Sequence, residues 1–377
     1  MNLHLTHDDK VLDLFIETAT SLGISEDKYL IYTSLSELHY VKSKKALFAP
    51  YDSPLFWAQI GDIQQYDKIF LHYLSHELVD FVNKIQTSAT IIWVFWGADA
   101  FHELPFFREY FFQPETRKLY RKQTHLTPFL SFNPLKIARY FAFYYHDWHN
   151  LKQRLKAFER IDYFAHYILQ DFALIKAHYP QLKATFVPFH YAAIETVAGT
   201  EIKMQGEHIL LGNSADFSGN HIDAMLKMRK WNLGTRKLIA SLGYGDDNSR
   251  KIVLKKGKQW FGAAFEPLTK FMPLEAYNHI LTTIGVAMMP QERSQAAANL
   301  MVLVWNGAKL YMAEKSTLYQ LFSEYGLHVY TIESPHFAEK EAFCPLTERQ
   351  KTENRQALLR LWGREKYVKM FKNVLNL

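Results

Sequence analysis

The segment at 208–229 constrains the fold of this chain more than any other. It opens on the apolar run Ile209–Leu211, continues through a loop of small and polar residues at 212–219, and ends in an amphipathic helical pattern over 221–229. A strand, loop and helix in this order place unpaired backbone N–H groups where an anion can bind. Ordinary turns between a parallel strand and a helix have the same order, so the loop alone leaves both interpretations open.

The same alternation of apolar runs and helical patterns recurs along both halves of the chain. We predict strands at 3–5, 29–32, 46–48, 68–72, 90–95, 160–165, 184–187, 209–211, 237–242, 285–290 and 309–313. We predict helices at 11–21, 78–85, 221–229, 274–284, 295–305 and within 348–377. Strands that alternate with helices build parallel sheets, so the fold class is α/β with two Rossmann-like domains. We place the first domain at 1–200, the second at 201–335 and a helical tail at 336–377, with a linker over 188–206.

The composition limits the partners and the compartment. The chain has 377 residues, enough for about two domains. Its net charge of +6 and pI of about 9.0 suit an anionic partner. The single cysteine, Cys344, excludes an internal disulfide, and the N-terminal residues lack the features of a signal peptide. No apolar run approaches the roughly 18 residues that span a bilayer, so we expect a cytoplasmic protein that is soluble or lies on one face of a membrane.

Several common motifs are absent from the sequence. Without HExxH or another metal spacing there is little support for a zinc enzyme, and without GxxxxGK[ST] there is none for a P-loop kinase. GxGxxG after the first strand and GxSxG are also missing, which weakens dinucleotide and serine-hydrolase interpretations. The basic residues are dispersed rather than striped, so we expect no nucleic-acid partner.

Three loops of the second half follow predicted strands and carry the candidate anion-binding residues. Glycines there allow close backbone approach, and Ser294 is a good N-cap for the helix after it. We expect replacement of Gly212 by Val to weaken nucleotide binding without unfolding the chain. The candidate residues are Gly212, Asn213, Ser214, Ser218, His221, Gly243, Tyr244, Gly245, Gln291, Glu292, Arg293, Ser294 and Gln295.

Two features of the first half each have two interpretations. Asp99 follows the buried strand at 90–95, where an α/β sheet places its ligands, but an Asp there is also a common helix cap. The segment at 105–150 is rich in Phe, Tyr and Trp and has more Lys and Arg than Asp and Glu. It is either an aromatic helical hairpin that packs on itself, or a surface that faces an anionic membrane or an acceptor.

Three stretches together carry a family resemblance. IWVFWGADAFHEL at 92–104, ILLGNSADFSGNHI at 209–222 and SLGYG at 241–245 resemble the bacterial TDP-4-acetamido-4,6-dideoxygalactose (TDP-Fuc4NAc) transferases of glycosyltransferase family 56. The resemblance implies a GT-B architecture, with two Rossmann-like domains facing across a cleft. It also implies transfer of an amino-deoxysugar from a nucleotide donor to a polyprenyl-diphosphate-linked acceptor at the cytoplasmic face of the membrane. The long aromatic segment and the loop at 291–294 depart from the family pattern.

We therefore expect a metal-independent, inverting glycosyltransferase of bacterial surface polysaccharide synthesis, with no cofactor. Helix N-termini near Ser218 and Ser294, assisted by Arg293, would stabilise the leaving diphosphate. Asp99 would be the general base, and Glu292 or Gln291 would orient the sugar. Candidate acceptor-side residues are His72, Trp96, Gly97 and Glu103.

The expected partners are a nucleotide-sugar donor, a lipid-linked or glycan acceptor, and the anionic inner-membrane surface as a peripheral contact. Two alternatives remain at this point. One is a non-catalytic module that binds nucleotides or sugars, and the other is a sugar-nucleotide epimerase of similar architecture.

Overall fold

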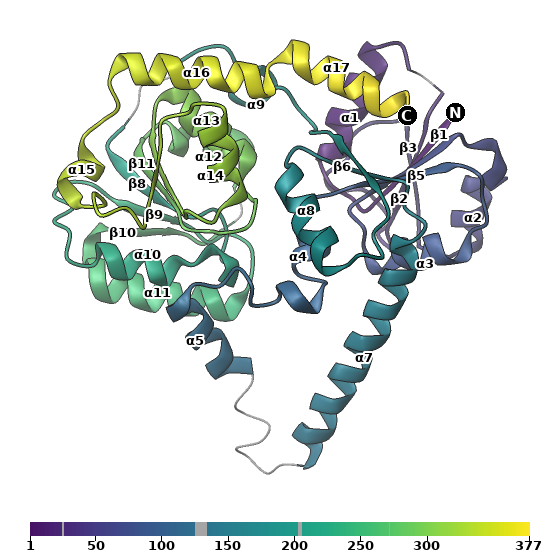
Figure 1. Ribbon diagram of the computed structural model, residues 1–377, viewed down its shortest axis with the longest axis horizontal. Helices are drawn as coiled ribbons and strands as arrows, with labels where there is room; N and C mark the ends of the chain where they lie inside the picture. The colour runs from purple at the N-terminus through teal and green to yellow at the C-terminus, as the bar shows by residue number, and fades with distance from the viewer. Residues whose placement is uncertain (25, 125–133, 203–205, 271) are drawn as a thin grey trace. The chain divides into compact units, whose positions relative to one another are not determined.

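The computed structural model describes residues 1–24, 26–124, 134–202, 206–270 and 272–377. The chain divides into two compact units, each built on one parallel sheet with helices packed against it (Figure 1). The first unit comprises Met1–Arg108, Ala138–Ala192 and Tyr367–Leu377, and the second comprises Glu109–Ile137 and Ala193–Lys366. Two parallel-sheet α/β domains are the predicted fold class. Across the described ranges, every helix is too short or too polar to cross a bilayer.

The first unit has a seven-stranded sheet in the order β3-β2-β1-β4-β5-β6-β7. The order reverses between β1 and β4, and ligands of open α/β sheets bind at the carboxyl ends of strands at such a switch point. The strands are β1 (Asn2–Thr6), β2 (Lys28–Tyr32), β3 (Ala46–Ala49), β4 (Lys68–His72), β5 (Thr90–Val94), β6 (Tyr163–His166) and β7 (Thr185–Pro188). The helices are α1 (Val11–Ser21), α2 (Pro54–Ile60), α3 (His76–Lys84), α4 (Ala98–Phe101), α7 (Pro134–Phe158), α8 (Leu169–His178) and most of α17 (Arg364–Leu375).

Strand alternation and register show which helices cover which face of this sheet. On β4, Phe70 contacts Phe15 of α1, with ring centroids 6.0 Å apart. Trp93 of β5 pairs in register with Leu71, the neighbour of Phe70, so its side chain lies on the opposite face. Trp93 stacks there on Phe158 of α7, at 5.4 Å between centroids. The first sheet is therefore packed between α1 on one face and α7 on the other.

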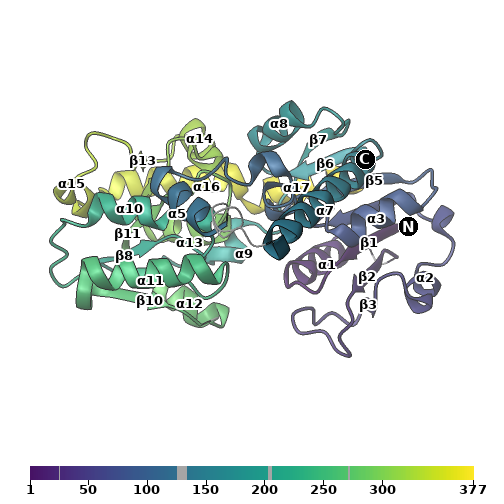
Figure 2. The same cartoon turned by 90° about the horizontal axis from the view of Figure 1, so that it is seen from below.

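The second unit has a six-stranded sheet in the order β10-β9-β8-β11-β12-β13, and its switch point lies between β8 and β11. Figures 1 and 2 show α10 and α11 on one face of the sheet, and Figure 1 shows α12, α13 and α14 on the other. The strands are β8 (His208–Leu211), β9 (Leu238–Ser241), β10 (Phe265–Leu268), β11 (Ile284–Met289), β12 (Lys309–Met312) and β13 (Val329–Thr331). The helices are α5 (Pro114–Thr124), α9 (Ile194–Ala198), α10 (His221–Met228), α11 (Asp247–Phe261), α12 (Leu274–Leu281), α13 (Ala297–Asn306), α14 (Thr317–Glu324), α15 (Glu339–Phe343) and α16 (Glu348–Trp362).

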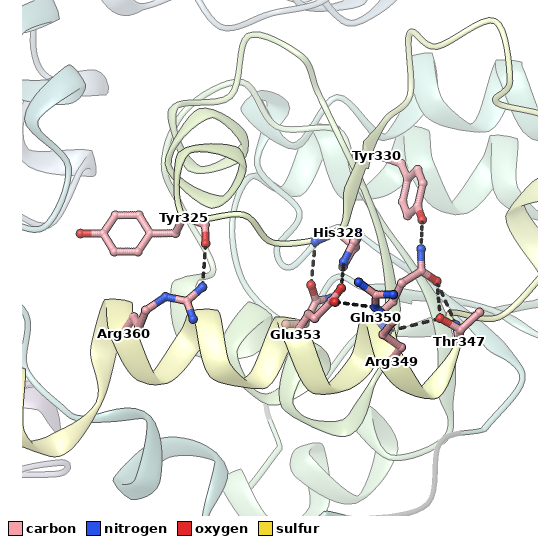
Figure 3. Close-up of polar contacts among 9 residues, drawn as sticks. Tyr325, His328, Tyr330, Thr347, Arg349, Gln350, Glu353 and Arg360 are labelled. Carbon is pink, nitrogen blue, oxygen red and sulfur yellow. Dashed lines mark hydrogen bonds and ion pairs between the residues drawn. The ribbon is translucent and has the colours of Figure 1, made fainter.

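Helix α16 is joined to the β13 edge of the second sheet by polar contacts (Figure 3). Thr347 begins the helix with a capping box, in which its hydroxyl accepts from Gln350 N–H and the Gln350 side chain accepts from the Thr347 backbone. Glu353 binds His328 Nε2 at 2.6 Å, and the Gln350 amide donates to the hydroxyl of Tyr330 at 3.4 Å. The first part of the predicted tail is thus an integral layer of the second unit, while the last eleven residues, Tyr367–Leu377, belong to the first.

Several predicted boundaries are wrong. The helix predicted from 295 begins at Ala297, and its N-cap is Ala296 in the left-handed conformation rather than Ser294, so no side chain caps it. The strand predicted at 160–165 begins only at Tyr163, and the predicted linker contains α9. Elements without a prediction include the strands β10 and β13 and the helices α2, α8, α11 and α14.

The aromatic segment at 105–150, predicted either as a hairpin that packs on itself or as a surface facing a membrane or an acceptor, is divided between the two units. Its first helix, α5, lies against α10 of the second unit, whereas most of α7 belongs to the first. The segment at 128–132, which carries two of its aromatic residues, lies outside the described residues.

Candidate functional site

Three loops meet at the carboxyl edge of the second sheet, next to its switch point. Ala215 N donates to the Tyr244 carbonyl at 2.7 Å, which ties the loop after β8 to the loop after β9. Gly212 N donates to the Met288 carbonyl at 2.9 Å, which ties the first of these loops to β11. A Cβ at Gly245 would lie 2.8 Å from Asp216 N, so only glycine allows the first two loops to approach this closely. The structure therefore brings the three predicted loops together.

A buried arginine lies within this group of loops. The Arg293 side chain is 8% exposed, and its Nε donates to Ser218 Oγ at 2.9 Å. A second polar contact joins the loops after β8 and β9: Asn213 Nδ2 donates to the Tyr244 hydroxyl at 3.2 Å. Tyr244 is otherwise exposed. A cation fixed by a hydroxyl, beside amide and phenol groups, is suited to binding an anion.

Several buried polar atoms at this edge lack a hydrogen-bond partner within the part of the chain that the structure describes. They include Asn213 Oδ1, Gln291 Oε1 and Gln295 Nε2. Buried polar groups are almost always hydrogen-bonded in folded proteins, so a cluster of unpaired ones is characteristic of a site that a ligand or water completes. With His221, whose two ring nitrogens are also among these atoms, four of the predicted residues share this property.

His221 lies beneath the loop after β8. Its ring is buried, and burial lowers its pKa to about 4, so the imidazole is neutral at physiological pH. A Cβ at Gly212 would lie 2.4 Å from His221 Nε2, and Gly212 has a φ of +62°. This contradicts our expectation that Val at position 212 leaves folding intact. A part for His221 in donor binding stays a prediction.

The other predicted residues of these loops vary in burial. Ser214 and Ser294 are buried, and Glu292 and Gly243 are half-buried. Burial raises the pKa of Glu292, an effect that nearby Lys315 partly offsets.

Helix α5 docks beside these loops through two polar side chains. Asn220, which has a left-handed φ of 48°, accepts from Gln113 N at 2.9 Å. Asp223 accepts from the backbone N–H groups of Glu115 and Thr116, both at 2.9 Å, and so caps the N-terminus of α5. The aromatic segment thereby places the Gln113 side chain against the loop after β11, where its amide donates to the Pro290 carbonyl at 3.3 Å.

In the first unit, Asp99 is fully buried and its carboxylate holds the loop after β5. It accepts from Trp93 Nε1 at 2.7 Å and from the backbone N–H groups of Leu74 and Trp96, both at 3.1 Å. Burial raises the pKa of Asp99. The N-cap of α4 is Gly97, at φ 97°, so Asp99 is not that cap. With 0% of its surface exposed, Asp99 lacks the contact with an acceptor that a general base needs, and we give it a positioning role.

The predicted acceptor-side residues fall into two groups. His72 and Trp96 both bind the Tyr191 hydroxyl, through Nδ1 at 2.6 Å and Nε1 at 2.8 Å. Glu103 instead pairs with His76 at 2.9 Å, with the buried Arg154 Nη2 3.6 Å away. Within the described residues, no group of three or more His, Cys, Asp or Glu side chains is placed to hold a metal ion.

Comparison with known proteins assigns this chain to a family. The model of the 4-alpha-L-fucosyltransferases, glycosyl transferase group 56, matches residues 143–339, just over half of the chain. The chain belongs to this family. It is a nucleotide-sugar glycosyltransferase, as the resemblance predicted, and the epimerase and non-catalytic alternatives lose their support. No curated protein matches the sequence.

Solved structures with the same fold include GT-B glycosyltransferases of very low identity. Sucrose-phosphate synthase from Thermosynechococcus elongatus has a TM-score of 0.64 and 9% identity, with 100% of this chain and 98% of that chain covered. The UDP-forming alpha,alpha-trehalose-phosphate synthase of Burkholderia xenovorans, in complex with glucose-6-phosphate, has a TM-score of 0.59, 9% identity, and 100% and 99% coverage. These similarities show the GT-B fold of this glycosyltransferase.

The sequence analysis did not predict two pairs of candidate site residues at the carboxyl edges of the sheets. Ser316 and Thr317 begin α14, after β12, and their buried hydroxyls have no partner among the described residues. Their position after a strand was the available signal. His7 and Tyr73 follow β1 and β4, at the switch point of the first sheet, and are half-buried. Only the strand order brings these two together.

Proposed function

We propose that the second unit binds the nucleotide-diphospho-sugar donor at the carboxyl ends of β8, β9 and β11, and that the first unit binds the acceptor. The observation that carries the proposal is the buried Arg293, held by Ser218 at 2.9 Å beside unpaired amide groups. A diphosphate carries negative charge and acceptor oxygens, which the Arg293 guanidinium and the amide nitrogen of Gln295 can bind.

The proposed chemistry requires stabilisation of the departing diphosphate. Arg293 supplies a positive charge, and the start of α14, with Ser316 and Thr317, supplies N–H and hydroxyl donors. Glu292 and Gln291 are proposed to orient the donor sugar. A cation and helix dipoles can together stabilise the leaving group, so we propose transfer without a bound metal, to be tested by activity in excess EDTA.

We propose an amino-deoxysugar donor and a lipid-linked or glycan acceptor of bacterial surface polysaccharide synthesis. The family description names a fucosyltransferase, and fucose is a 6-deoxysugar. A solved relative of the fold from E. coli is described as bound with UDP-2-fluoro glucose, at a TM-score of 0.57 and 10% identity over 100% of this chain and 99% of that one. Both descriptions are compatible with a nucleotide-activated hexose as donor.

The donor site is tested by calorimetric titration of TDP, UDP and GDP into the full chain. We expect Arg293→Gln to weaken binding of the preferred nucleotide about 10- to 100-fold, because a hydrogen bond to a charged group contributes about 1.5–3 kcal/mol. Arg349→Gln is the matched control, since Arg349 is 87% exposed on α16. Ser218→Ala keeps the charge and should have a smaller effect.

Unchanged affinity in Arg293→Gln, with a melting temperature like that of the unsubstituted chain, would contradict the donor site. Because Arg293 is buried, Arg293→Gln can affect folding as well as nucleotide affinity. The Ser218→Ala variant, which keeps the arginine, is measured beside it to separate a loss of affinity from a loss of folding.

We also propose a peripheral contact with the cytoplasmic face of an anionic membrane, through α7. Tyr145 and Trp148 are 69% and 59% exposed, and Lys152 lies over the Trp148 ring at 5.6 Å. These residues recur at helical spacing on one face of α7, and aromatic rings beside cations suit the headgroup region. Trp148→Ala with Lys152→Ala should reduce flotation with anionic liposomes at low salt, and equal flotation would contradict the contact.

A further inference from the structure

Three aromatic side chains meet at the carboxyl edge of the first sheet. His7 follows β1, Tyr73 follows β4 and Trp96 follows β5. The His7 ring centroid is 5.1 Å from that of Tyr73 and 5.2 Å from that of Trp96, and the other two centroids are 5.6 Å apart. The strand order reverses between β1 and β4, so the cluster occupies the position at which an α/β sheet binds its ligand.

The backbone at Tyr73 is strained. Its φ of +68° is rare for a bulky side chain. Two hydrogen bonds hold it there: Tyr73 N donates to the Val94 carbonyl at 3.1 Å, and Ser75 N donates to the Tyr73 carbonyl at 2.8 Å. Strain of this kind collects at ligand sites. The strained residue turns directly out of β4 at the switch point.

A buried chain of polar groups fixes the third ring. Trp96 Nε1 donates to the Tyr191 hydroxyl at 2.8 Å, and that hydroxyl binds His72 Nδ1 at 2.6 Å. His72 Nε2 in turn lies 3.0 Å from His4 Nδ1. The Trp96 ring itself remains half-buried, so one end of a rigid network is accessible. Rings held in this way form a platform with little entropy left to lose on binding.

The charges around His7 leave it able to take a proton. Burial lowers the pKa of His7 below its ordinary value, and four carboxylates partly oppose that effect: Asp8 and Asp9 from the same loop, Glu77 from α3 and Asp99 from α4. The imidazole is therefore neutral at physiological pH. Unlike the fully buried Asp99, His7 is half-buried and can touch a ligand.

We propose that His7, Tyr73 and Trp96 form the acceptor-sugar subsite and that His7 is the general base of transfer. The subsite rests on the proposed function, in which the second unit holds the donor. The acceptor oxygen bonds to the anomeric carbon as the bond from that carbon to the diphosphate oxygen breaks. The nucleoside diphosphate leaves with the electron pair, and the acceptor's hydroxyl proton moves to an imidazole nitrogen of His7. A single displacement of this kind inverts the anomeric carbon.

The experiment compares His7→Gln with the unsubstituted full chain. Transfer from TDP-Fuc4NAc to a polyprenyl-diphosphate-linked saccharide is measured as a function of pH, and TDP affinity is measured by calorimetry. We expect kcat to fall about 10²- to 10⁴-fold and the acid limb of the pH profile to disappear, with TDP affinity unchanged. His336→Gln, an exposed histidine of the second unit, is the matched control.

Trp96→Leu separates binding of the acceptor from proton transfer. Loss of an aromatic platform worth about 1.4 kcal/mol should raise the acceptor KM about tenfold and change kcat much less. A kcat of His7→Gln close to that of the control, or a product with retained anomeric configuration, would overturn the proposal. Failure of the unsubstituted chain to bind TDP, UDP or GDP would instead overturn the donor site.

Discussion

The carboxyl edges of the two sheets have the same topology and opposite chemistry. The second edge combines closely approaching backbone with a buried cation, Arg293, and unpaired amides and hydroxyls. The first edge, at the equivalent switch point, has the aromatic rings of His7, Tyr73 and Trp96 and a buried network of neutral histidines. One edge is suited to an anion, and the other to an uncharged ring that bears hydroxyl groups.

Under the proposed function, this difference explains how one fold unit, used twice, binds two substrates. A parallel sheet with a switch point supplies a place for a ligand but not its identity. The loop residues supply the identity, because glycine permits close backbone approach whereas an aromatic ring fills the same space with a flat apolar surface. Under the proposed assignment, the glycosyltransferase therefore distinguishes its donor and acceptor sides by loop composition.

The largest expected effect comes from filling the close approach at the second edge. Gly212→Val places a side chain against His221 and a β-branched residue at φ +62°. The positive φ costs about 1–2 kcal/mol and the collision about 1–3 kcal/mol, so we expect a loss of about 2–5 kcal/mol in the free energy of unfolding. Chemical denaturation followed by circular dichroism measures it.

Gly234→Val is the matched control for this substitution. Gly234 has nearly the same φ, +58°, but a Cβ there would meet nothing within 4 Å. It should therefore show the backbone cost alone. Equal losses of unfolding free energy in the two variants would mean that the close approach of Gly212 to His221 does not contribute to stability. The contrast between the two edges would then no longer include this close backbone approach.

Local sequence patterns were sufficient for the elements with clear periodicity and for the grouping of the three loops at the second edge. The helix Val11–Ser21 and the strand Lys68–His72 have the predicted bounds, because an amphipathic period and a continuous apolar run are unambiguous there. The edge strand Phe265–Leu268 was not predicted, since its Pro267 and Glu266 are atypical of a strand interior. Such residues are tolerated at an edge, where one side of the strand is unpaired.

Of the proposed acceptor subsite, Trp96 was predicted from the sequence but His7 and Tyr73 were not, because the three residues are far apart along the chain. His7, Tyr73 and Trp96 come together only through the order β1-β4-β5. The burial of Asp99 could not be predicted from the sequence either, and it is the reason that we do not assign Asp99 as the general base. Its position after a strand was predicted correctly, but the hydrogen bonds from Trp93 and the Leu74 backbone, which occupy its carboxylate, are not local signals.

A smaller effect is expected from Asp99→Asn, which tests whether the first edge uses Asp99 for support or for chemistry. The carboxylate accepts three hydrogen bonds in a fully buried position, and Asn offers one acceptor oxygen and one NH₂ group in its place. At least one donor then faces another donor, which costs about 1–3 kcal/mol of unfolding free energy.

Asp62→Asn is the control, because Asp62 is an exposed cap on Gln64 N and Asn caps about equally well. Denaturation should show the loss only in Asp99→Asn, while kcat at a temperature well below the melting transition should fall less than about tenfold, far below the 10²- to 10⁴-fold typical of a lost general base. A loss of kcat on that larger scale, with stability unchanged, would return the base to Asp99 and remove it from His7.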